Sequence, residues 1–167
     1  MKDFRNIARG RQSQRRGAVA ENILHTEAIR TGWTVVKIPL GCRQVSAVKL
    51  LRVATAFDFV LIKGPRVLFI DSKTTKSKTF SFSAITDHQV RILRDIELHG
   101  HASGYVVNFT AHKKTVFFCG SQLWALRAGA SLKPDDGIHI GDDRIINLSR
   151  IFEQDSTLTH SDASILK

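Results

Sequence analysis

The 167-residue chain has no run of about 18 uncharged apolar residues, which is the length a helix needs to cross a bilayer. Residues 1–16 also lack the apolar segment of a signal peptide. Without these two kinds of apolar segment, the sequence does not have the pattern of a membrane-spanning or exported protein. We therefore expect a cytoplasmic protein with no membrane partner, and its length and 43% apolar content suit a single packed domain.

Cysteines are few, and motifs for several reaction classes are missing. Cys42 and Cys119 stand outside any CxxC or CxxxH spacing, so the sequence predicts two free thiols and no zinc site or disulfide framework. There is no glycine-rich phosphate loop followed by Lys and Ser or Thr, which argues against ATP-driven action. The serines stand in no nucleophile elbow.

Acidic residues are fewer than basic residues. Fifteen Asp and Glu stand against 25 Lys and Arg, which gives a formal net charge of +10. Such an excess favours a polyanionic partner, and nucleic acid is the leading candidate. A ribosome or an anionic membrane surface would suit the same charge, so the reaction has to be argued from motifs.

The charge and the apolar pattern divide the chain into three parts. Residues 1–16 hold six basic residues against one acid and no apolar periodicity, which predicts a flexible basic arm. Residues 153–167 are polar and rich in Ser and Thr, which predicts a flexible tail. The folded domain is expected between them, over residues 17–152.

Within that domain the apolar periodicity predicts alternating element types. Residues 41–52 hold three basic residues and no acid, and we expect a basic loop or short helix there. The resulting architecture is a mixed α/β sandwich of one sheet with flanking helices. The expected helices are 18–31 and 85–99, and the expected strands are 33–38, 57–62, 66–73, 104–109 and 115–119.

Two apolar strands each carry an acid. Asp58 lies within FDFVLI, and Asp71 ends VLFID, two residues before Lys73. Because side chains alternate along a strand, Asp71 and Lys73 share a face. A turn at residues 63–65 would pair the strands and bring Asp58 beside Asp71. Two carboxylates and one ammonium group would then converge.

Close carboxylates repel each other and favour a hard divalent cation such as Mg²⁺. The cation can bind a phosphate oxygen and activate water, while a lysine orients that water or stabilises charge. This is the chemistry of phosphodiester hydrolysis. The alternative for Asp58, Asp71 and Lys73 is a strand-end acid and a surface ion pair.

A third acid, Glu21, shares its helix face with Leu24 and Ala28, so it should point toward the sheet or its edge. The alternative is an exposed acid in the first helical turn.

Glu21, Asp58 and the Asp71-Ser72-Lys73 triplet together resemble the PD-(D/E)XK nuclease pattern, with Phe57 in place of the proline. More narrowly, FIDSKTTKSKTFSFSAITDHQVRIL (69–93) and RGAVAEN (16–22) are similar to RecU-type Holliday junction resolvases. Two departures are visible. Asp71 stands where that family usually has glutamate, and the segment between Ile38 and Asp58 is short for the family's protruding stalk.

This resemblance implies a restriction-endonuclease-like fold, a mixed β-sheet core flanked by α-helices. It also implies a bacterial or phage-encoded homodimer that resolves four-way DNA junctions by paired incisions, leaving 5′-phosphates. Mg²⁺ would be the cofactor, and Mn²⁺ would substitute. The alternatives are a flap, nicking or restriction-like nuclease, and a junction-binding module without catalytic activity.

The resemblance also implies residue roles. Asp58, Asp71 and Glu21 would bind metal, Lys73 would act on the attacking water, and Gln89 would orient phosphate or water. Gln89 could instead bind only helix backbone. Further DNA contacts are expected from a second group of polar and basic residues, each of which could equally be a solvated surface residue: Arg16, Arg43, Lys49, Thr74, Thr75, Lys76, Lys78 and His88.

Overall fold

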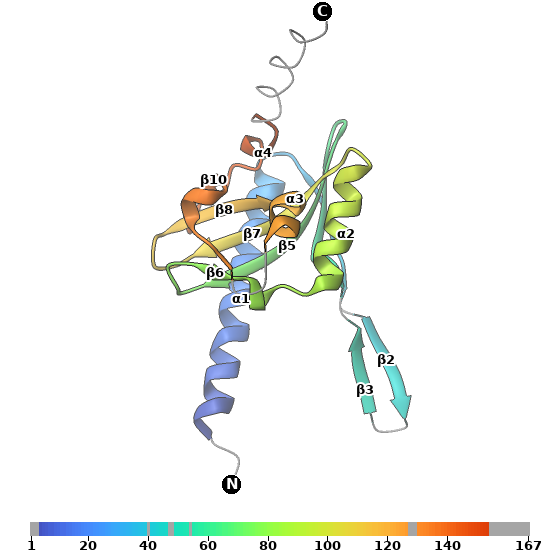
Figure 1. Cartoon of the computed structure of the whole chain (residues 1–167), viewed down its shortest axis with the longest axis vertical. Coiled ribbons are helices and arrows are strands. Elements are labelled where there is room, and N and C mark those ends of the chain that lie inside the picture. Colours follow the sequence, from blue (N-terminus) through green and yellow to red (C-terminus); the bar gives the residue numbers. More distant parts are fainter. Residues whose placement is uncertain (1–3, 40, 47–48, 54, 127–129, 154–167) are drawn as a thin grey trace, which may run out of the picture.

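A computed structural model describes the backbone of residues 4–39, 41–46, 49–53, 55–126 and 130–153, and the side chains of 17–39, 55–126 and 130–153. Its centre is a six-stranded sheet in the order β1-β4-β5-β7-β8-β10 (Figure 1). All neighbours are antiparallel except β5 and β7, which are parallel. The strands are β1 Thr34–Lys37, β4 Phe59–Lys63, β5 Arg66–Thr75, β7 Ala102–Phe109, β8 Lys114–Cys119 and β10 Ile138–Gly141.

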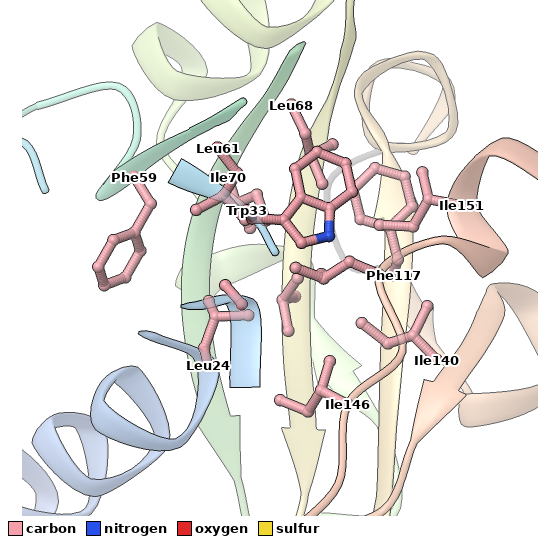
Figure 2. Close-up of a cluster of buried hydrophobic side chains, with 13 residues drawn as sticks. Leu24, Trp33, Phe59, Leu61, Leu68, Ile70, Phe117, Ile140, Ile146 and Ile151 are labelled. Carbon is pink, nitrogen blue, oxygen red and sulfur yellow. The ribbon is translucent and has the colours of Figure 1, made fainter. Parts of the chain in front are cut away.

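Helices cover both faces of the sheet, as the sequence predicts. One face packs against α1 (Phe4–Arg30) through Leu24 and Ala28, which are fully buried with Leu61, Leu68 and other apolar side chains of the sheet (Figure 2). The other face packs against α2 (Asp87–Leu98) and α3 (Gly120–Ala125). The chain is therefore a mixed α/β protein whose central strands are buried on both sides.

Helix α2 makes the crossover between the parallel strands β5 and β7. Its start is fixed by a capping box, in which Thr86 Oγ1 accepts from the Gln89 backbone N–H and the Gln89 side chain accepts from the Thr86 N–H. Gly100 follows the helix with a φ of 82°, a left-handed conformation that glycine adopts without strain. These local signals place α2 where the sequence predicts it.

Two segments differ from the expectation. Helix α1 begins at Phe4 rather than near residue 18, so residues 4–16 of the expected flexible arm are helical. Once residues 17–30 are fixed by packing, each further turn adds a backbone hydrogen bond without a new nucleation cost. This half of α1 projects from the body of the domain (Figure 1).

In the segment 41–52, expected as a loop or short helix, the described residues form the antiparallel strand pair of β2 (Gly41–Ser46) and β3 (Lys49–Val53), which we call the hairpin. This hairpin also projects from the body (Figure 1). Its strands pair with each other, so their conformation depends on the pairing rather than on helical or turn propensity.

Several short elements were not predicted from the sequence. Short strands β6 (Phe80–Ser81) and β9 (Ser131–Leu132) pair with each other, and α4 (Arg150–Glu153) follows β10. The expected flexible tail lies outside the described residues beyond Glu153. No helix in the described part of the chain is long and apolar enough to cross a membrane.

Candidate active site

Asp58 and Asp71 lie side by side where β4 and β5 meet. The two strands pair antiparallel with Phe59 opposite Ile70, and Asp58 directly precedes Phe59, beside Ile70 and Asp71 of β5. The Asp58 N–H donates to the Ile70 carbonyl at 2.8 Å, and the Ser72 N–H donates to Asp58 Oδ2 at 2.9 Å. The neighbouring strand thus fixes both the backbone and the carboxylate of Asp58, as the hairpin prediction requires.

The Asp71 side chain is almost completely buried, with 1% of its surface exposed. Its Oδ1 accepts a hydrogen bond from Gln89 Nε2 at 2.9 Å. Its Oδ2 lies 2.5 Å from Lys73 Nζ and, apart from this ion pair, has no hydrogen-bond partner among the described residues. Asp71 and Lys73 do share a face of β5, and an acceptor oxygen is left for a further ligand.

Burial dominates the electrostatics of both acids. It raises the pKa of Asp71 to about 7, against the lowering effect of Lys73 and with a further increase from the charge of Asp58. Burial also raises the pKa of Asp58, opposed by the Ser72 hydrogen bond and by Lys73. One lysine therefore does not compensate for two desolvated carboxylates, and the pair lacks positive charge.

The Asp71 pKa predicts how stability depends on pH. The folded pKa of about 7 lies above the value near 3.9 of an unfolded aspartate. The folded state therefore holds this proton more tightly, and the free energy of unfolding should fall by on the order of a few kcal/mol as pH rises from about 4 to 7. Mg²⁺ should restore stability at pH 8 more than at pH 5.5, because it binds the deprotonated carboxylate.

Thermal unfolding at both pH values, with and without Mg²⁺, measures this effect. Other groups also titrate in that window, so Asp71→Asn is the control that removes only the contribution of Asp71. A Mg²⁺-induced rise in Tm that is equal in wild type and Asp71→Asn would contradict the prediction.

Gln89 joins α2 to β5 through Asp71. Its Oε1 accepts from Thr86 Oγ1 at 3.1 Å, while its Nε2 donates to Asp71 Oδ1. The side chain is 8% exposed. Gln89 therefore binds the backbone at the start of α2 and the Asp71 carboxylate at once, and its expected role toward phosphate or water stays a prediction.

Gln89→Ala should lower junction cleavage about 10- to 100-fold, because the residue that orients the Asp71 carboxylate is lost. It should also cost about 1 kcal/mol through the lost cap. Gln122→Ala is the matched control, since Gln122 is the third residue of α3 and its Oε1 accepts from the Cys119 N–H at 3.1 Å. Cleavage rates and Tm of both variants test this. Equal activity of the two variants would exclude a role for Gln89 at Asp71.

Glu21 lies near the acids but does not join them. Its Oε2 accepts from Lys37 Nζ at 2.8 Å, and its charge raises the pKa of both Asp58 and Asp71. Asp71 faces α2, where it binds Gln89, whereas Glu21 belongs to α1, which packs on the other face of the sheet. Within the described residues no three Asp, Glu, His or Cys side chains gather as a metal site.

The family can be stated once this geometry is compared with known proteins. The sequence profile of RecU, Recombination protein U, matches residues 19–131. The chain belongs to the RecU family. RecU proteins are endonucleases that resolve Holliday junctions and bind branched DNA, and the matched range contains the acids, Lys73 and Gln89. The comparison with curated proteins found no match.

The fold agrees with this membership. The Hjc Holliday junction resolvase of the archaeon Archaeoglobus fulgidus superposes with a TM-score of 0.55 at 16% identity, covering 75% of this chain and 95% of Hjc. The bacterial homing endonuclease I-Ssp6803I superposes with a TM-score of 0.44 at 14% identity, covering 86% of this chain and 92% of that chain. The restriction-endonuclease-like α/β core expected from the sequence is confirmed by the Hjc match.

RecU-family nucleases depend on a metal ion, and the residues present fit one. Asp71 Oδ2 is buried with an ion-pair partner only, and Asp58 supplies a second carboxylate beside it. Both are hard oxygen ligands, which suit Mg²⁺ or Mn²⁺. A cation would also compensate for the desolvation that raises both pKa values.

Five of the eight residues expected to contact DNA have described side chains, on β5, just beyond it and on α2. Thr74 and Thr75 are half-buried at the end of β5, and Lys76 and Lys78 are exposed just beyond it. His88 is exposed on the first turn of α2, next to Gln89. Thr74 and Thr75 thus share β5 with Asp71, and His88 directly precedes Gln89, which binds Asp71. The side chains of Arg16, Arg43 and Lys49 lie outside the described set.

Two residues near the RecU acids could not be found from the sequence. Lys37, on β1, pairs with Glu21 and lowers the pKa of Asp58. Tyr105, on β7, stands next to Asp71 in the parallel register. Both residues reach the acids only through strand pairing, which no local motif reveals. β1 pairs with β4, and β7 pairs with β5 after a helical crossover.

Proposed function

We propose that the chain cuts four-way DNA junctions by Mg²⁺-dependent hydrolysis at Asp58, Asp71 and Lys73. The observation that carries this proposal is the pair of desolvated carboxylates on adjacent strands, with Lys73 2.5 Å from Asp71. A structural ion pair would need one acid, whereas this site gathers two acids around one lysine. Membership of a family of Holliday junction endonucleases supports the same reading.

Each residue has a separate task. Asp58 and Asp71 would hold the cation, which when bound supplies charge stabilisation at phosphate and a more acidic water. Lys73, 29% exposed at its side chain, can reach solvent and substrate and would orient the attacking water or stabilise the phosphate charge. Gln89 would keep Asp71 oriented. Glu21 would assist only after leaving Lys37, so we assign it to the rim of the site.

Cleavage by water attack on phosphorus would leave 5′-phosphate and 3′-hydroxyl ends. A four-way junction is resolved by two symmetric incisions. One copy of the chain supplies one proposed active site, so we propose a homodimer with two active sites. The exposed Lys76 and Lys78 and the threonines before them would bind backbone phosphates. Arg16, Arg43 and Lys49 would add contacts that weaken with salt.

The test is cleavage of a labelled mobile four-way junction beside flap and linear duplex DNA, with Mg²⁺, Mn²⁺ or EDTA. We expect symmetric incisions in the junction with either metal and none with EDTA. Equal cutting of all three DNAs would replace junction resolution by general nuclease activity. Tight junction binding without cutting in any metal would leave only a binding function.

A further inference from the structure

Tyr105 extends the row of acids by one strand. Asp58 directly precedes β4 and accepts a hydrogen bond from the Ser72 N–H of β5, next to Asp71. On the other side of β5, Tyr105 of β7 is paired with Asp71. Paired residues of neighbouring strands point to the same face. Tyr105 therefore flanks Asp71 on the side away from Asp58, and its side chain is completely buried.

The Tyr105 hydroxyl is unused in the fold as described. Its oxygen is buried and has no hydrogen-bond partner among the described residues. A buried hydroxyl without a partner costs free energy, and such groups are rare in folded proteins. Phenylalanine would fill the same space among the neighbours Phe80, Val90 and Leu93 without this cost. Packing alone therefore does not account for the hydroxyl.

Lys73 is a candidate hydrogen-bond donor to the Tyr105 hydroxyl. Lys73 Nζ lies 5.6 Å from the centre of the Tyr105 ring, within the range of a cation–π contact. The same ammonium group pairs with Asp71 Oδ2, the oxygen that a metal ion would occupy. An ammonium group has three donors, and a cation at Asp71 would repel it. Lys73 then needs another partner close by.

Resting on the function proposed above, we propose that Tyr105 is a positioning residue for Lys73. Its ring holds the ammonium group beside the acids, and its hydroxyl accepts a hydrogen bond from Lys73 Nζ once a metal ion binds Asp71. Lys73 then stays beside the acids without forming an ion pair with the Asp71 carboxylate that binds the metal ion. Tyr105 thereby allows one lysine to serve the metal-free and the metal-bound enzyme.

Tyr105→Phe removes only the hydroxyl. We expect its single-turnover cleavage of the junction with Mg²⁺ to fall about tenfold, as for other residues that orient a catalytic group. Junction affinity in EDTA should stay unchanged, and Tm should be equal to or higher than that of wild type. Trp33→Phe is the matched control, because Trp33 Nε1 is also buried without a hydrogen-bond partner but lies on the α1 face. Its cleavage rate should match wild type.

A second readout does not depend on cleavage. Tyr105 is the only tyrosine in the chain, so 3-fluorotyrosine labelling gives one ¹⁹F resonance. Adding Mg²⁺ without DNA should shift this resonance in wild type and shift it less in Lys73→Met. Equal shifts in the two proteins, or an unchanged cleavage rate in Tyr105→Phe, would overturn the role of Tyr105. Failure of wild type to cut the junction would instead overturn the proposed function.

Discussion

Asp71→Asn should abolish junction cleavage, with a rate loss of about a thousandfold or more. The substitution keeps the shape and an acceptor for Gln89 but removes the charge that holds the cation. Loss of roughly 4 kcal/mol of transition-state stabilisation corresponds to a thousandfold in rate. The fold should survive, because the change removes a buried carboxylate whose pKa is already raised to about 7.

Three measurements on the same preparation define this result: junction cleavage with Mg²⁺, junction binding in EDTA, and Tm. Binding should remain within a fewfold of wild type, since the contacts with phosphates are elsewhere. Asp95→Asn, an exposed acid on α2, is the charge-matched control and should cleave normally. Cleavage by Asp71→Asn at more than a tenth of the wild-type rate would refute the assignment of Asp71 as a metal ligand.

Gly104→Ala should cost at least about 3 kcal/mol of stability. Gly104 lies on β7 between β5 and β8, where an added Cβ would meet the Phe118 carbonyl oxygen at 2.0 Å and the Phe117 ring at 2.9 Å. The first contact is with backbone, which cannot rotate away. In a domain of this size the loss corresponds to a fall in Tm of roughly 6 to 12 °C.

The same substitution at Gly17 should have the opposite sign. Gly17 lies inside α1, and an added Cβ there meets nothing within 4 Å. Alanine should therefore raise stability by about 0.5–1 kcal/mol through helix propensity. Chemical denaturation of the two variants beside wild type checks both predictions. A Gly104→Ala protein as stable as Gly17→Ala would mean that β7 and β8 are less closely packed than described.

Much of the arrangement of the candidate site was predictable because its signals are local. An acid inside an apolar run is costly wherever it is buried, and the short turn at residues 63–65 forces the two runs to pair. That single turn fixes the register that sets Asp58 beside Asp71. The capping residues of α2 are equally local, and they locate Gln89 near the site.

The remainder depends on contacts between distant segments. The parallel pairing of β5 with β7 places Tyr105 beside Asp71, yet these residues are separated by a whole helix. The hairpin of β2 and β3 was missed because basic residues in a short segment suit a loop, a helix or a strand pair alike. Glu21 was placed on the correct helix face, but its pairing with Lys37 required knowing that β1 lies at the sheet edge.

β5 carries both Asp71 and Lys73, and it is paired with β7 in parallel register from Leu68 to Thr75. Its first half also pairs with β4 and belongs to the core. A strand held in this way cannot detach alone, so the amide protons of Asp71 and Lys73 should exchange with solvent at the rate of global unfolding. The strand that carries Asp71 and Lys73 therefore keeps its place for as long as the protein stays folded.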